Sequence, residues 1–487
     1  GDVFSTGGTL QTDTAQDYTN LGAITQLANT TFIASDGVFP TNPQNITFDA
    51  ANVITGVFDL GIQGDTIDVY AIGDGAANPT AATINGVTQI NANTDIQTDG
   101  DITLTSADLQ LNGDLTSNSG DITINADTPL LGNRVITSSG GDVLFNGTVD
   151  GAFDLDVQAG AGDITMANAF GGTTPLTSLI MNGANLTLLD ITTVGSQDFT
   201  GSADLNGDLV TTNSNVTFNS DLTLSANSTV NTGAGAGDIT FADTVDGTFD
   251  FDLTAGTGDI SFAGNTGGSA RLDTLTIISA DNTTLGGTTR VNSLQQNAGT
   301  GDTALGNLQA TGQVNVQRPQ NITGTITAGQ TILRAVDDIN ATVDVASLLI
   351  DSSTATLIGR VNNKTDRDAA NQVELANIVP GPYYMNGYAL PVVGNAVPPN
   401  IFKSSDDGLV QDGTLSVRLN LLRGQRSVLN PFLPDHRMVI SSAPEFAVVD
   451  YTRQDLFRYL QDTDTPPLDT FWTWLEALPY HMGLSRY

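Results

Sequence analysis

One short phrase recurs along the chain and limits what it can fold into: Gly-Asp followed by an apolar, a small and an apolar residue. It begins at Gly100, Gly120, Gly141, Gly162, Gly237 and Gly258. Its spacing is about 20 residues, apart from one long interval between Gly162 and Gly237. Within a phrase the apolar residues lie two apart, as Ile164 and Met166 do, which predicts a strand with one buried face. Matched strands at a nearly constant spacing indicate a repeat protein.

A longer copy contains this phrase. Residues 237–285 repeat residues 141–188 after a shift of 96 positions, with about half of the residues identical near the start. The duplication indicates that one structural unit was copied end to end.

The repeat length selects the architecture. A period of about 20 residues is too short for a helix pair or a propeller blade and suits one turn of a parallel β-helix, with short strands joined by tight corners. The Gly-Asp pairs are expected at those corners, because Gly adopts positive φ and Asp accepts hydrogen bonds from its own downstream backbone. We therefore predict an all-β chain folded as a β-solenoid.

The charge of the chain is concentrated in its first part. The formal net charge is −37, and residues 1–350 carry five Arg, no Lys and 38 Asp, which leaves −33 there. All three Glu lie later, at Glu374, Glu445 and Glu476. Asp without Glu favours turn chemistry, because Asp bends and caps the backbone where Glu does not. So much negative charge argues against nucleic acid and anionic membranes as partners.

A sharper interpretation of the same carboxylates is a calcium site, since Ca²⁺ prefers oxygen ligands. The candidate ligands are those that recur in both copies: Asp150, Asp154, Asp156, Asp246, Asp250 and Asp252. The glycine-rich nonapeptide of calcium-loaded repeat toxins is absent. Solvated corners and bound calcium both stay open, and we expect no other cofactor.

The chain has no Cys, which excludes thiol chemistry and Cys metal sites. It contains no run of 18 apolar residues, so we expect nothing to span a membrane. It begins at Gly1 without an apolar leader, so we expect either a removed signal peptide or a trimmed chain. We expect a protein that is secreted after signal-peptide removal and lies outside the cell or on its surface.

The organisation follows from where the phrase appears and where it stops. Residues 1–50 lack it and are expected to form a cap or an edge-strand segment, because a solenoid must cover its first apolar layer. Residues 51–350 are predicted to form the parallel β-helix, and residues 351–390 its closing turns and a linker. Prolines then break the rhythm, so residues 391–487 are predicted to be a separate α+β module for assembly or anchoring.

The segments Val149 to Thr165 and Ala328 to Ile332 resemble the filamentous-haemagglutinin-type repeats of large secreted bacterial surface proteins. Residues 347–387 are similar to the stretch that often closes such arrays. The resemblance covers about residues 50 to 390. It implies a right-handed parallel β-helix, export across the cell envelope, and roles in adhesion, fibres or biofilm. No amino-terminal secretion domain of the two-partner type and no carboxy-terminal barrel is recognised.

The last module carries eight of the 16 Lys and Arg residues and both Trp. Strands are expected over Gly413 to Leu422 and Met438 to Val449, and short helices over Thr452 to Leu460 and Leu468 to Leu478. His436 beside Asp435 is suggestive of acid-base work or metal binding. A polar loop is the preferred interpretation, since two His cannot make a His-rich metal site and no nucleophile motif accompanies them. The candidate assembly interface is Arg423, Arg426, Arg453, Arg458, Trp472 and Trp474.

Three classes of function remain in competition. We prefer a non-enzymatic structural or adhesive protein that polymerises head to tail, its partners being further copies of itself and, as alternatives, a cell-surface glycan or an outer-membrane anchor. A β-helical polysaccharide-degrading enzyme needs a carboxylate cluster with a base, and the five Arg before residue 350 are far apart in sequence. An ice- or crystal-binding solenoid is suggested by the outward residues Thr103, Thr123, Thr165 and Thr240, interrupted by Leu144 and Ser261.

Overall fold

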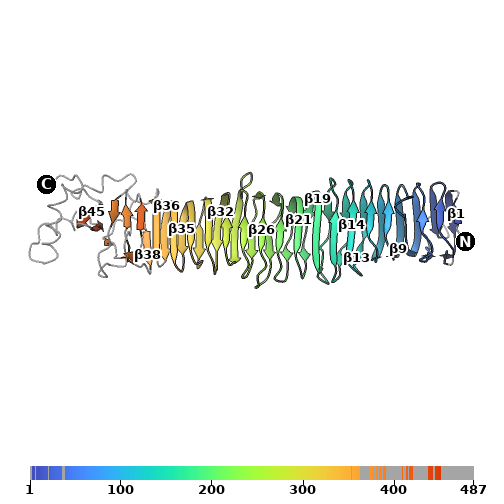
Figure 1. Cartoon of the computed structure of the whole chain (residues 1–487), viewed down its shortest axis with the longest axis horizontal. Helices are drawn as coiled ribbons and strands as arrows, with labels where there is room; N and C mark the ends of the chain where they lie inside the picture. Colours follow the sequence, from blue (N-terminus) through green and yellow to red (C-terminus); the bar gives the residue numbers. More distant parts are fainter. Residues whose placement is uncertain are drawn as a thin grey trace, which may run out of the picture. The chain divides into compact units, whose positions relative to one another are not determined.

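The computed structural model describes residues 3–5, 7–19, 21–35 and 39–351, and beyond residue 351 only the strands β37 to β46. Side chains are described for residues 7–19, 21–35, 39–337, 339–343 and 345. Every regular element of this part is a β-strand, and from β1 to β38 the strands pair in parallel with their equivalents one turn later (Figure 1). The all-β solenoid expected from the repeat is confirmed.

The described chain divides into two compact units, residues 1–249 with 254–256, and residues 250–253 with 257–487. In the first unit, each turn contributes strands to three parallel sheets, which we call faces 1, 2 and 3. One turn illustrates this: Ile102 pairs with Ala82 on face 1, Leu109 with Ile90 on face 2, and Leu115 with Ile96 on face 3.

Face 1 comprises β2 (Gly8–Thr12), β5 (Thr30–Ala34), the first halves of β8 (Leu60–Val69), β9 (Ala82–Ala92), β11 (Ile102–Leu111) and β13 (Ile122–Pro129), then β15 (Val143–Phe145), β18 (Ile164–Met166), the second halves of β19 (Ser178–Leu188) and β21 (Gln197–Leu205), β24 (Leu222–Leu224) and β27 (Val245–Asp246). Face 2 comprises β3 (Gln16–Asp17), β6 (Ile46–Thr47), the second halves of β8, β9, β11 and β13, and β16 (Val149–Asp150), β20 (Ile191–Thr192), β22 (Leu209–Val210) and β25 (Ser228–Asn231).

Face 3 comprises β1 (Val3–Ser5), β4 (Ile24–Gln26), β7 (Ile54–Thr55), β10 (Ile96–Thr98), β12 (Leu115–Ser117), β14 (Arg134–Ser138), β17 (Asp154–Gln158), the first halves of β19 and β21, β23 (Val216–Phe218) and β26 (Ile239–Phe241). The segment expected to cap or edge the array contributes β1 to β6, all in parallel register with later strands. Its role as a cap stays a prediction.

The core of the first unit is the column of side chains that alternation directs inward. Ile102, Ile122, Val143 and Ile164 follow one another on face 1 and are fully buried. Phe199, Phe218 and Phe241 follow one another on face 3, with ring centroids 5.0 and 5.5 Å apart and nearly parallel planes. Such stacking adds to area burial because equivalent residues of successive turns meet directly.

The duplicated copy lies on different faces from its original. Val143 is on face 1 whereas its copy Ile239 is on face 3, and Val149 is on face 2 whereas Val245 is on face 1. Five turns separate Val143 from Val245, which both lie on face 1. Ile239, the copy of Val143, lies one face before Val245, so the shift between the copies amounts to about four and two-thirds turns. The six phrases therefore do not form one column, which corrects the expectation of six equivalent strands.

Turn length varies because loops are inserted at the corners. In the first unit the turn from Leu186 to Ala203 is short, whereas the turn from Thr30 to Leu60 is nearly twice as long. In the second unit successive turns shorten steadily, from Thr283 to Thr303, then to Ile322, to Ile339 and to Ala355. The nearly constant spacing of the Gly-Asp phrase therefore holds only over short stretches and does not describe every turn.

The second unit also stacks its strands in parallel. Its early strands are β28 (Phe251–Thr254), β29 (Ile260–Phe262), β30 (Leu272–Ser279), β31 (Thr283–Leu285), β32 (Thr288–Gln296), β33 (Thr303–Ala310) and β34 (Val314–Gln317). Three long strands follow, β35 (Ile322–Arg334), β36 (Asp338–Asp351) and β37 (Thr354–Val361). β35 and β36 pair over most of their length, from Ile322 with Ile339 to Arg334 with Asp351.

The remaining described strands are β38 (Val373–Ala376), β39 (Pro380–Gly381), β40 (Tyr383–Met385), β41 (Tyr388–Leu390), β42 (Gly408–Leu409), β43 (Gly413–Thr414), β44 (Ser416–Leu419), β45 (Arg437–Ser442) and β46 (Glu445–Asp450). β38 pairs in parallel with β36, and β44 with β37, while β45 and β46 form an antiparallel pair. The helices expected over Thr452 to Leu460 and Leu468 to Leu478 lie outside the described residues.

Candidate functional site

The Gly-Asp corners are linked from one turn to the next by their carboxylates. Oδ1 of Asp101 accepts a hydrogen bond from the backbone N–H of Asp121 at 2.9 Å, and Asp121 accepts one from Asp142 at 2.8 Å. Asp142 accepts in turn from Asp163 at 2.8 Å. We call Asp101, Asp121, Asp142 and Asp163 the aspartate ladder. The sequence predicted a bond within the corner, and the structure corrects this, since each bond crosses to the following turn.

The glycine of the phrase is needed for close approach between turns. A Cβ at Gly141 would lie 2.3 Å from the backbone C and O of Gly120, and one at Gly162 would lie 2.1 Å from the carbonyl O of Gly141. Neither residue has positive φ, so the expectation of left-handed backbone at these corners is wrong. Removing the side chain lets equivalent corners of successive turns touch through their backbones.

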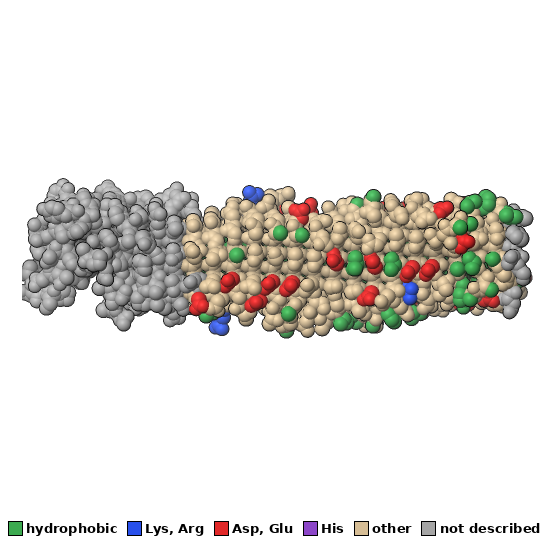
Figure 2. All heavy atoms as spheres, in the orientation of Figure 1, with side chains coloured by type: hydrophobic (Ala, Val, Ile, Leu, Met, Phe, Trp, Pro, Cys, Tyr) green, Lys and Arg blue, Asp and Glu red, His purple; other side chains and the backbone are tan. Residues whose placement is uncertain are grey.

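Other corners use the same device with other partners. Asp114 accepts from the N–H of Val135 at 2.9 Å, Asp127 from the N–H of Thr148 at 3.0 Å, and Asp208 from the N–H of Thr229 at 2.8 Å. Amide side chains form similar links, as where Asn125 donates to Thr105 at 3.1 Å. Figure 2 shows the acidic side chains in red along the visible described surface, where blue basic ones are few. The Asp-rich composition therefore has a structural role between turns.

The calcium candidates of the first copy are already engaged in hydrogen bonds. Oδ1 of Asp150 accepts from the N–H groups of Thr173 and Thr174, at 2.8 and 3.0 Å. Asp154 accepts from Asn133 Nδ2 at 2.8 Å and from Ser178 Oγ at 2.6 Å. Asp156 accepts from the amide of Gln158. The three carboxylates lie on β16, at the start of β17 and within β17, and they serve different donors.

In the second copy, Asp246 ends β27 in the first unit, whereas Asp250 and Asp252 belong to the second. Asp250 Oδ1 accepts from the N–H of Thr274 at 3.1 Å. Within the described residues, no three His, Cys, Asp or Glu side chains are grouped so as to hold a metal ion. A calcium site at these positions stays a prediction.

The six residues predicted for the assembly interface lie outside the described residues: Arg423, Arg426, Arg453, Arg458, Trp472 and Trp474. His436 lies outside them as well. The prediction for this module is therefore unchanged by the structure. In the part of the chain that is described, there is also no helix with the length and apolar character of a membrane span.

The outward threonines form a row, though not the one expected. Thr83, Thr103 and Thr123 follow one another on face 1. After Leu144 the row continues with Thr165 and Thr187. Thr240 instead lies on face 3 beside Thr217, because its phrase belongs to the rotated copy. The row gains two members that the phrase pattern did not reveal and loses one that it predicted.

The arginines of the solenoid differ in how their side chains are satisfied. Arg134 lies 3.5 Å from the carboxylate of Asp114. Arg271 donates to the carbonyls of Val291 and Gln309, at 2.9 and 2.7 Å, and Arg290 donates to the carbonyl of Gly268 at 3.2 Å. These three guanidiniums thus serve the stack itself.

The remaining two, Arg318 and Arg334, were judged far apart in sequence, yet they line one pocket on successive turns. The signal that could have found them is their separation in sequence, which nearly equals the local turn from Ile322 to Ile339.

Aromatic residues fill the early turns of the first unit. The ring of Tyr18 stacks on Phe48, with centroids 4.9 Å apart, and meets Phe32 edge-on at 5.2 Å. Its hydroxyl donates to Oε1 of Gln16 at 2.8 Å. Burial raises the pKa of the Tyr18 phenol to about 12, because the charged form is poorly solvated there.

Two exposed carboxyls titrate below their ordinary range. Hydrogen bonds from Thr19 lower the pKa of Asp17. Backbone N–H groups of Ala77 and Ala76 lower the pKa of Asp74. In both cases the donors stabilise the ionised carboxylate, which is turn chemistry of the kind expected from Asp.

No protein-family model, no curated protein and no solved structure matches this chain.

Proposed function

We propose that this protein is a structural and adhesive β-solenoid of the cell exterior, of the filamentous-haemagglutinin type, and that it is not an enzyme. The observation that carries the proposal is repetition of the same contacts on successive turns. The aspartate ladder links successive turns to one another, and the threonine row presents the same side chain outward on successive turns. A periodic surface suits adhesion or lateral packing, in which many weak equivalent contacts act together.

Secretion after removal of a signal peptide belongs to the same proposal. The absence of Cys fits it without disulfides, because the parallel ladder and buried column already hold the stack. Partners would be further copies of the chain, with a cell-surface glycan or an outer-membrane anchor as alternatives.

Head-to-tail polymerisation is the specific form of assembly that we propose. The stack that such a contact would meet is acidic, since residues 1–350 carry 38 Asp against five Arg. Leu10 on β2 keeps 42% of its surface exposed and offers an apolar contact. The module of residues 391–487 carries both Trp and eight of the 16 Lys and Arg residues, and these cations can pair with carboxylates of an acidic partner.

Deleting residues 391–487 tests this assembly. Electron microscopy of the purified chain is expected to reveal filaments, and the truncated chain only single particles. Circular dichroism dominated by strand would establish that the truncated chain still folds. Filaments of unchanged repeat after the deletion, or a full-length chain that stays monomeric at high concentration, would contradict head-to-tail polymerisation.

A second candidate function rests on the threonine row of face 1. Thr83, Thr103 and Thr123 repeat along a parallel sheet at the strand spacing of about 4.8 Å. A regular row of hydroxyl and methyl groups can match a lattice such as ice or a crystal surface. Thermal hysteresis of the pure protein, lost in Thr103→Asp and kept in Thr217→Asp on face 3, would support this candidate. Absence of hysteresis in the wild type would remove it.

A further inference from the structure

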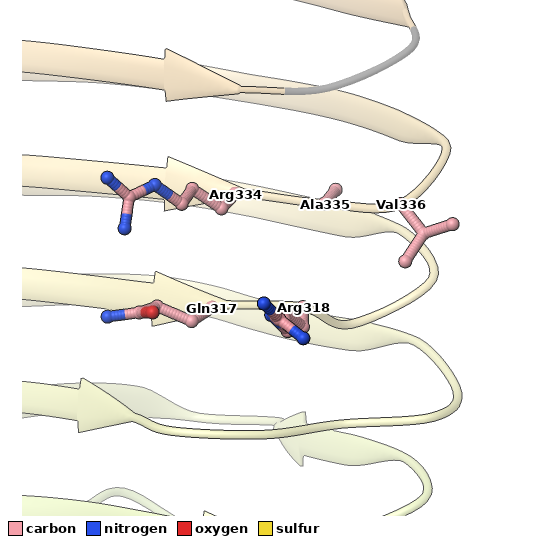
Figure 3. Close-up of a pocket in the computed structure, with 5 residues that line it drawn as sticks. All are labelled: Gln317, Arg318, Arg334, Ala335 and Val336. Carbon is pink, nitrogen blue, oxygen red and sulfur yellow. The ribbon is translucent and has the colours of Figure 1, made fainter. Parts of the chain in front are cut away.

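A pocket in the second unit is lined by Arg318 and Arg334, the two solenoid arginines for which the described residues show no side-chain hydrogen bond or ion pair. Gln317, Arg318, Arg334, Ala335 and Val336 line a hollow of about 310 Å³ (Figure 3). Gln317 pairs in register with Arg334, so the two side chains extend in the same direction from adjacent turns. The volume of the pocket is at the lower end of the range for small-molecule sites, which is about 300 to 1,000 Å³. The pocket suits a ligand the size of one sugar.

The charge of this pocket contrasts with the rest of the solenoid. Residues 1–350 contain five Arg against 38 Asp. Asp337 is close in sequence, but its carboxylate accepts a hydrogen bond from Gln320. Among the side chains that the structure describes, no carboxylate pairs with Arg318 or Arg334. Two cations on adjacent turns repel each other unless an anion lies between them.

The backbone at the pocket is held in an uncommon conformation. Arg318 has φ of +64°, in the left-handed region that non-glycine residues rarely adopt. Its N–H donates to the carbonyl of Arg334 at 2.7 Å, and the N–H of Val336 donates to Pro319 at 2.9 Å. These bonds fix the backbone of Arg318 against the next turn, where the Arg334 side chain extends along β35 beside that of Gln317 (Figure 3). Strained backbone of this kind persists where the surroundings hold it, and it is common at ligand sites.

We propose that this pocket binds the carboxylate of a small acidic sugar, with a uronate as the class of ligand. The guanidiniums of Arg318 and Arg334 supply paired N–H donors that match the two oxygens of a carboxylate. The amide of Gln317 can serve a sugar hydroxyl, and Ala335 with Val336, which is 54% exposed, offers an apolar wall for the C–H face of the ring. The pocket can take a soluble acid whether or not the solenoid is adhesive.

One internal competitor must be tested. Asp351 is the register partner of Arg334 on β36, the next strand of the stack. If its carboxylate satisfied Arg334, the wild-type pocket would be closed to external anions. Asp351→Asn distinguishes these cases, because it removes one negative charge at that position.

The experiment is calorimetric titration of the full-length protein with glucuronate, glucose and inorganic sulfate at low salt. We expect glucuronate to bind and glucose not to bind. Sulfate can also accept paired hydrogen bonds from a guanidinium, so it should compete, but more weakly than glucuronate, because it offers no hydroxyl to Gln317 and no ring face to Ala335 and Val336. Glucose binding equal to glucuronate, or sulfate binding tighter than glucuronate, would overturn the proposal without reference to any variant.

Variants locate the site. Arg318→Gln and Arg334→Gln should each weaken glucuronate binding by at least about tenfold, the range expected for a charge-assisted hydrogen bond. Arg134→Gln is the matched control, because it removes the same charge in the first unit, and it should leave the affinity within about twofold. Equal loss in all three variants would mean that only the overall charge matters. Binding seen in Asp351→Asn but not in the wild type would also refute the proposal.

Discussion

The first unit and the later turns of the second unit hold their corners together by different means. In the first unit, carboxylates accept backbone N–H groups of the following turn, as Asp121 does from Asp142. From Thr303 onward the turns shorten and the strands lengthen, so that β35 and β36 pair directly from one end of β35 to the other. In the later turns the printed links run between side chains, as from Gln320 to Asp337, and long paired strands supply most of the contact between one turn and the next.

The largest effect is expected from charging the column that the first unit depends on. Ile164 is fully buried on β18, so Ile164→Asp should lower the free energy of unfolding by about 3–5 kcal/mol, because the carboxylate has no partner there. Chemical denaturation measures the change. Ile180→Asn is the control, since Ile180 is 42% exposed on β19 and should cost little. Equal costs would mean that the inward column does not carry stability.

Two adjacent glycines test whether close approach governs the corners of the first unit. A Cβ at Gly141 would meet the backbone of Gly120 at 2.3 Å, while one at Gly140 would meet nothing within 4 Å. Gly141→Ala should therefore destabilise by about 1–3 kcal/mol or more, and Gly140→Ala should be nearly neutral. Thermal melts of both variants make the comparison. Similar melting temperatures would contradict the packing of corner on corner.

Removing one rung of the aspartate ladder tests the carboxylate links themselves. Asp121→Ala leaves the N–H of Asp142 without its acceptor and should cost about 1 kcal/mol, measured by denaturation. Asp121→Asn keeps an acceptor oxygen and should cost less. Asp13→Ala provides the control, because Asp13 accepts no described hydrogen bond, and its cost should be negligible. If Asp13→Ala cost as much as Asp121→Ala, the ladder bonds would not be the cause.

Alkaline pH should weaken the early turns of the first unit through Tyr18. The unfolded phenol ionises near pH 10, whereas burial raises the pKa of the folded phenol to about 12. The folded chain then holds the proton more tightly, so its stability is full below pH 10 and falls as pH rises to 12. Tyr18 is only half-buried, so solvent screening reduces the loss to on the order of 1 kcal/mol. Tyr18→Phe should remove this part of the pH dependence in denaturation curves.

The smallest effect is expected from calcium. The hydrogen bonds already accepted by Asp150 and Asp154 favour an unchanged melting temperature in excess chelator. A clear fall in melting temperature on chelation, restored by calcium, would establish bound ions by mass action and would reverse this preference. Asp154→Asn would then be expected to reduce the calcium effect.

The sequence predicted which residues form strands and point inward. It did not predict on which face of the solenoid each strand lies. Alternation predicted that Ile164 and Met166 point inward, and both are buried. The face of Ile239 could not be predicted, because it depends on loop lengths summed over the preceding turns. The role of Asp121 was missed for a related reason, since its partner Asp142 belongs to another turn. Local patterns report local geometry only.

The same limit applies to the candidate sites. Arg318 and Arg334 were judged far apart because their separation in sequence was not compared with the length of one turn. Residues about one turn apart lie on adjacent strands and are close in space. The prediction of the assembly residues is based only on the Arg and Trp content of that module. The calcium candidates were selected by recurrence, and recurrence is equally expected of residues that link one turn to the next.

The rotated duplication has a consequence for how the surface is presented. Because the shift between the copies does not complete a whole number of turns, the outward side chains of Val143–Phe145 and those of its copy Ile239–Phe241 point in directions about a third of a revolution apart. A motif written twice in the sequence is therefore displayed at two azimuths around the axis of the first unit. Duplication in this chain increases the number of directions from which a partner can approach, and it does not widen any one binding face.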